Sequence, residues 1–122
     1  MIEYNRANSN RDCGVRMTKV KVASKEDLKM HPLMGIEIRE RRILLARVKD
    51  EYFAMDGLCG HAKGRLWDGT IEDYIVTCPK HGSQYDVRTG RAVKGPWIPL
   101  AKAKDLNTYP VTLDGEDVFI EI

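Results

Sequence analysis

The chain has 122 residues, and its 20 Lys and Arg nearly balance its 18 Asp and Glu, which gives a formal net charge of +2. A chain of this length forms a single domain, and the balanced charge gives no sign of nucleic-acid binding or of attraction to a membrane surface. No stretch of the sequence approaches the roughly 18–20 apolar residues that a membrane span needs.

The N-terminal segment is polar and lacks the apolar stretch of a secretory signal. We expect residues 1–17 to be a flexible tail and the protein to be cytoplasmic. Ser24 to Asp27 resembles a helix-capping sequence, and Pro32 limits this helix to one or two turns. Strand-like runs lie at 18–22, 35–38, 43–48, 52–55, 74–77, 108–113 and 118–122.

Turn signals separate these runs. Asp-Gly pairs occur at 56–57, 68–69 and 114–115, and the last of them predicts a hairpin close to the C-terminus. Many short strands with frequent turns are typical of an all-β sandwich or barrel. The three cysteines are too few and too scattered for the disulfide framework of a secreted domain.

Two loops each carry one cysteine and one histidine. Cys59 and His61 follow the strand-like run at 52–55, and Cys78 and His81 follow the run at 74–77, with sixteen residues between His61 and Cys78. Either pair alone fits a nucleophile with its base, half a zinc site or half an iron–sulfur site. Because two of the three cysteines and two of the three histidines lie in these matched loops, a shared metal site is favoured.

The order of the ligands distinguishes between metals. A zinc finger usually groups two cysteines and then two histidines, whereas each loop here supplies one of each. Two metal ions between the loops could take the thiolates and the imidazoles separately. This is the arrangement of the asymmetric [2Fe–2S] centre in which two histidines replace two cysteines on one iron. A mononuclear zinc or iron site, or no metal, remains the alternative.

The segments CGHAKGRLWDG (59–69) and CPKHGSQYDVRTG (78–90) resemble the paired cluster loops of soluble Rieske-type [2Fe-2S] ferredoxins. The resemblance runs from Thr18 to the C-terminus and implies a Rieske domain over 18–122, all-β, with stacked antiparallel sheets and a small cluster-binding subdomain of two ligand loops. It also implies one [2Fe-2S] cluster. In this arrangement Cys59 and Cys78 bind the inner iron, and His61 and His81 bind the outer iron.

The resemblance further implies a set of residues around the ligands, namely Pro79, Gly82, Ser83, Tyr85 and Pro96. Ser83 and Tyr85 match positions whose hydroxyls, in high-potential members, donate to a bridging sulfide and to a ligand sulfur. Pro96 belongs to a proline-containing loop that shields the cluster. Gly64 and Lys80 stand where high-potential members carry a disulfide, so we expect a potential in the lower or middle part of the Rieske range.

The implied function is that of a monomeric one-electron carrier, which passes electrons from a flavin-dependent reductase to a terminal oxygenase or a similar acceptor. A catalytic oxygenase would need a second iron held by two histidines and a carboxylate, and the 41 residues after His81 contain no histidine. We therefore expect an electron-transfer protein and not an enzyme. Two alternatives remain: a small Rieske subunit of a larger reductase such as nitrite reductase, and a zinc-stabilised β module that binds without redox chemistry.

Basic residues lie in or beside the two ligand loops, at Lys63, Arg65 and Lys80. They give that end of the domain a positive character. We expect an acidic docking patch on the partner and an association rate that falls with salt.

Overall fold

Three antiparallel sheets make up the computed structural model, which describes residues 18–59, 64–80, 82–95 and 104–122. The first sheet has the order β1 (Lys19–Ser24), β11 (Asp117–Glu121) and β10 (Val111–Asp114). The second has the order β2 (Leu33–Ile38), β3 (Arg41–Val48), β4 (Glu51–Asp56) and β9 (Thr108–Tyr109). The third has the order β5 (Thr70–Glu72), β6 (Ile75–Thr77), β7 (Gln84–Asp86) and β8 (Ala92–Lys94).

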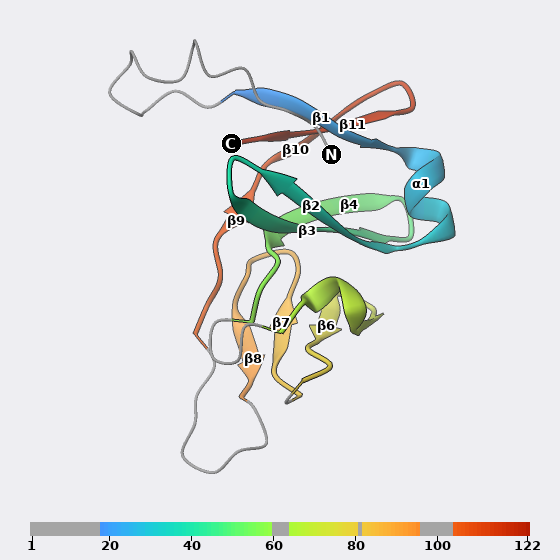
Figure 1. The fold of residues 1–122 in the computed structure, drawn as a ribbon. Coiled ribbons are helices and arrows are strands. Elements are labelled where there is room, and N and C mark those ends of the chain that lie inside the picture. Colours follow the sequence, from blue (N-terminus) through green and yellow to red (C-terminus); the bar gives the residue numbers. More distant parts are fainter. Residues whose placement is uncertain (1–17, 60–63, 81, 96–103) are drawn as a thin grey trace.

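The sheets are stacked, with the third at the opposite end of the molecule from the first (Figure 1). This confirms the predicted all-β architecture of antiparallel layers. The predicted tail at 1–17 lies outside the described residues.

β3 is an interior strand of the second sheet, between β2 and β4, and it is buried on both faces. Ile43 and Leu45 belong to the core against the first sheet, whereas Leu44 and Ala46 belong to the core against the third. A strand with a layer on each side needs apolar residues on both faces, so its sequence is a continuous apolar run without alternation. The Ile-Leu-Leu-Ala run thus places the second sheet in the middle of the stack.

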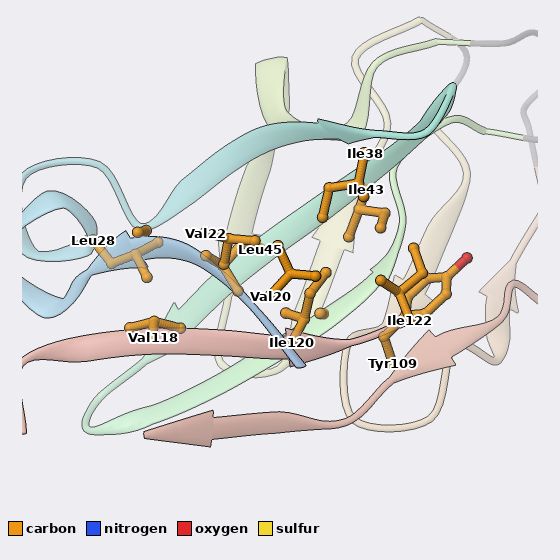
Figure 2. Close-up of a cluster of buried hydrophobic side chains, with 12 residues drawn as sticks. Val20, Val22, Leu28, Ile38, Ile43, Leu45, Tyr109, Val118, Ile120 and Ile122 are labelled. Atoms are coloured by element: carbon orange, nitrogen blue, oxygen red, sulfur yellow. The ribbon is translucent and has the colours of Figure 1, made fainter. Parts of the chain in front are cut away.

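The core between the first and second sheets is formed by apolar side chains from both (Figure 2). Its buried members include Val20, Val22, Ile38, Ile43, Leu45, Val118, Ile120 and Ile122. Burial of each such side chain stabilises the fold by about 1.5–3 kcal/mol. This core holds the first two sheets together at a distance from the cysteine loops.

The helix α1 (Lys25–Met30) closes one end of this core with the buried Leu28. Ser24 Oγ accepts a hydrogen bond from Asp27 N at 3.3 Å, and Asp27 Oδ2 accepts one from Ser24 N at 3.1 Å. This reciprocal cap confirms the predicted capping sequence, and the helix ends before Pro32 as expected. No helix among the described residues is long and apolar enough to cross a membrane.

Gly90 and Gly115 provide a matched pair for a stability test. Both have a left-handed backbone, with φ of 77° and 62°. A Cβ at Gly90 would lie 2.0 Å from the carbonyl oxygen of Leu106, whereas a Cβ at Gly115 would meet no atom within 4 Å. Leu106 N also donates to the Gly90 carbonyl at 2.7 Å, so the two backbones cannot easily separate.

We expect Gly115→Ala to lower the free energy of unfolding by about 1–2 kcal/mol, which is the cost of the left-handed conformation. Gly90→Ala adds a backbone clash, so it should lower the free energy of unfolding by roughly 3–4 kcal/mol. Urea unfolding of both variants, compared through their midpoints, checks this difference. If both variants lost the same free energy of unfolding, the backbones at Gly90 and Leu106 would be able to move apart without an energetic penalty.

Candidate metal centre

The two loop cysteines lie at corresponding places in the fold. Cys59 follows β4 and Cys78 follows β6, and their side chains are 0% and 1% exposed. Both thiols belong to the core between the second and third sheets, together with Leu66, Val76 and Tyr85. The structure therefore gathers the two cysteines into one buried apolar environment.

Backbone hydrogen bonds close both loops immediately beside the cysteines. In the first loop, Cys59 N donates to the carbonyl of Gly64 at 2.8 Å. In the second, Cys78 N donates to the carbonyl of Ser83 at 2.8 Å, and Gly82 N donates to the carbonyl of Cys78 at 3.1 Å. Gly82 has φ of 81°, a conformation that glycine adopts without steric cost. These bonds fix each cysteine at the base of a short closed loop.

The two loops contact each other at Gly64. A Cβ on this residue would lie 2.7 Å from Cys78 Sγ and 3.1 Å from Lys80 Cβ. Gly64 and Lys80, the two positions at which high-potential relatives are expected to carry a disulfide, thus lie side by side. The absence of a side chain at Gly64 is what allows the loops to approach this closely.

A second close approach occurs at Gly69, where a Cβ would lie 1.9 Å from the carbonyl oxygen of Thr77. Trp67, in the 3₁₀ helix η2 (Leu66–Asp68), packs over two further glycines. A Cβ would lie 2.5 Å from its ring at Gly35 and 2.7 Å from it at Gly57. In the sequence, Gly57 and Gly69 are recognisable only as turn residues, because nothing in a single sequence reveals which segments meet. These contacts anchor the loops to the second and third sheets.

Tyr85 directs its hydroxyl at one of the cysteines. Its side chain is fully buried, and its oxygen lies 3.3 Å from Cys59 Sγ. Burial, followed by the hydrogen bond with Cys59, raises the pKa of the Tyr85 hydroxyl above its ordinary value. The hydroxyl therefore stays protonated and able to donate.

Ser83 is also fully buried, and its Oγ makes no hydrogen bond of normal geometry in the part of the chain that the structure describes, although it lies close enough to the Tyr85 hydroxyl to oppose part of the rise in the pKa of that hydroxyl. A buried hydroxyl without a partner costs about 1–3 kcal/mol, so a bound group that accepts its proton would remove this cost. Two buried thiols beside an orphaned hydroxyl fit an iron–sulfur cluster, since thiolates suit such clusters and sulfide can accept a hydrogen bond.

The remaining predicted site residues are placed as follows. Pro79 lies in the second loop next to Cys78, and it is exposed. His61, His81 and Pro96 lie outside the described residues. Of the basic residues, Arg65 forms an ion pair with Asp68 at 3.1 Å between Nε and Oδ2, which the sequence analysis did not predict.

Comparison with known proteins agrees with this geometry. The family model of the Rieske [2Fe-2S] domain matches residues 18–110. The ferredoxin component of the naphthalene 1,2-dioxygenase system of Pseudomonas aeruginosa is 33% identical over 74% of this chain and 82% of its own length. The ferredoxin component of biphenyl 2,3-dioxygenase from Rhodococcus jostii (strain RHA1) is 34% identical over 87% of this chain and 94% of its own.

A solved ferredoxin structure has the same fold as this chain. The ferredoxin of carbazole 1,9a-dioxygenase from Nocardioides aromaticivorans IC177 superposes with a TM-score of 0.73 at 27% identity, over 84% of this chain and 96% of that one. The relatives are ferredoxin components and not catalytic subunits. The chain belongs to the Rieske [2Fe-2S] domain family, which implies an iron–sulfur cluster, and within that family it is a ferredoxin-type electron carrier.

Proposed function

We propose that the chain holds one Rieske-type [2Fe-2S] cluster on Cys59, His61, Cys78 and His81, and passes single electrons within an oxygenase system. The observation that carries the proposal is the pair of buried cysteines at the bases of two closed, touching loops. The histidines belong to the same two loops in the sequence, two and three residues after the cysteines. Each loop can therefore supply one thiolate and one imidazole.

The ligand types set the redox character of the site. When bound, the cluster supplies a one-electron couple. His61 and His81 bind as neutral imidazoles in place of two thiolates, which removes two negative charges from the coordination sphere. Fewer negative charges make it easier to add an electron, so the potential lies above that of an all-cysteine site.

The partners follow from the relatives. Their names identify them as ferredoxin components of dioxygenase systems, which supports a terminal oxygenase as acceptor for this chain. A flavin-dependent reductase is the matching donor. We propose that the carrier acts as a monomer in the cytoplasm and meets each partner transiently, since a shuttle must leave one partner before it reaches the other.

An EPR-monitored reductive titration, with iron and sulfide counted on the same sample, tests the proposal. We expect two irons and two sulfides per chain and a rhombic signal of the mixed histidine and cysteine type. A protein that contains zinc and gives no signal on reduction would instead be a structural metal module. Purification from the native host adds a check on the carrier role, because a reductase subunit would stay with its large partner.

A further inference from the structure

Lys80 lies over the contact between the two loops. The Cβ position of Gly64 is 2.7 Å from Cys78 Sγ, 3.1 Å from Lys80 Cβ and 3.7 Å from Lys80 Cδ. The cysteine sulfur and the aliphatic stem of the lysine therefore face the same side of Gly64. Because Gly64 has no side chain, Gly64 itself does not separate the stem from the sulfur at this point.

Lys80 and its neighbour Arg65 both carry one positive charge, but they differ in ion pairing. The guanidinium of Arg65 pairs with the carboxylate of Asp68 at 3.1 Å. Lys80 is exposed, and within the described ranges the structure records no ion pair for it. The structure thus leaves one uncompensated positive charge on the residue whose stem approaches Cys78.

A pocket of about 340 Å³ opens between the loops at this place. Among the residues that the structure describes, its lining comes from both loops and includes Gly64, Arg65, Asp68, Pro79 and Lys80. Two of these residues are cationic and one is anionic, so the pocket favours a negative group of modest size. A carboxylate side chain on the surface of a partner protein has the right charge to pair with Lys80.

We infer that Lys80 couples docking to electron transfer: its charge raises the electron affinity of the centre, and a carboxylate of an acidic acceptor protein that pairs with it in this pocket lowers that affinity again. The inference rests on the proposed function. A positive charge near the centre stabilises the state that holds the extra electron. A carboxylate that neutralises this charge removes the stabilisation while the partner is docked.

Linkage makes the effect reciprocal. If a docked carboxylate lowers the electron affinity by some factor, the oxidised carrier binds that carboxylate more tightly than the reduced carrier by the same factor. Docking on an acidic acceptor therefore favours release of the electron, with the carrier oxidised by one electron and the acceptor centre reduced by one. No proton has to move in this step.

The first test compares midpoint potentials of the loaded protein. Lys80→Met keeps most of the stem and removes the charge, Lys80→Gln is a second neutral variant, and Lys80→Arg keeps the charge. The control is Lys29→Met, in the last turn of α1 beside the other core. We expect both neutral variants to lose about three- to tenfold in electron affinity, which is a midpoint lower by about 28–59 mV at 59 mV per tenfold.

Lys80→Arg and Lys29→Met should keep the wild-type midpoint. In the neutral Lys80 variants, the lowering of the midpoint should become smaller at high salt, because salt screens a surface charge. The second test adds poly-L-glutamate as the acidic probe. It should lower the midpoint of the wild type but not that of Lys80→Met.

The outcomes separate the two proposals. Neutral variants that carry two irons and keep the wild-type midpoint overturn the role of Lys80 while the electron carrier stands. An unchanged wild-type midpoint in poly-L-glutamate overturns the coupling to docking. Absence of a cluster already in the wild-type protein overturns the proposed function itself.

Discussion

Cys59→Ser and Cys78→Ser are each expected to reduce the iron content of the purified protein from two per chain to nearly none. A serine hydroxyl stays protonated at neutral pH and is a hard ligand, so it does not replace the soft thiolate that iron–sulfur clusters require. The third cysteine provides the control. Cys13 is 46 residues before Cys59 and outside both loops, so Cys13→Ser should keep both irons and the full visible absorption.

Loss of the ligand must be distinguished from loss of the fold. Both positions are buried, and a buried serine hydroxyl without a partner costs about 1–3 kcal/mol. Far-UV circular dichroism of each variant should therefore be compared with that of wild-type protein from which iron has been removed by chelation. Matching spectra with no iron would assign the loss to coordination. Two irons retained in either serine variant would contradict the proposed ligand set.

The layered fold could be predicted because its main strands carry clear patterns. The apolar, branched run at 43–48 between turn signals predicts a strand and is confirmed by β3, and the hairpin at Asp114-Gly115 is confirmed by the pairing of β10 with β11. The turn between β2 and β3 gave no such signal. Arg39 and Glu40 both have positive φ, 49° and 68°, at positions where glycine or asparagine would be expected. The pairing of the flanking strands imposes this conformation against local preference.

The third sheet was largely missed. β5, β7 and β8 have three residues each, and β7 has a single fully buried side chain, that of Tyr85. Three residues are too few to show an alternating pattern. These strands form because they pair with each other beside the cysteine loops, which no local signal encodes.

The four candidate ligands are proposed from the sequence alone because coordination requires particular residue types at particular spacings. The contacts around them could not be predicted. The approach of Gly64 to Cys78 and Lys80 depends on two loops that are distant in the sequence, so no local pattern reveals it. A ligand pattern is visible in the local sequence, whereas the contacts around the candidate ligands are created by folding.

Tyr85→Phe is expected to lower the midpoint potential while both irons are retained. The Tyr85 hydroxyl lies 3.3 Å from Cys59 Sγ, and its raised pKa keeps it a donor to a thiolate at that position. A hydrogen bond to a charged group is worth about 1.5–3 kcal/mol. At 59 mV per tenfold for one electron, this corresponds to about 65–130 mV. The shift should stay below that limit, because both redox states keep the bond and only the difference between them counts.

Tyr109→Phe is the matched control for this experiment. Tyr109 is also a buried tyrosine, and its hydroxyl donates to Asp56 Oδ1 at 2.6 Å in the core between the first and second sheets. Burial and this bond raise the pKa of Tyr109 to about 12, so its hydroxyl also stays protonated. Loss of either hydroxyl should lower stability, but only loss of Tyr85 should change the potential. A wild-type midpoint in both variants would show that the Tyr85 hydroxyl does not tune the potential.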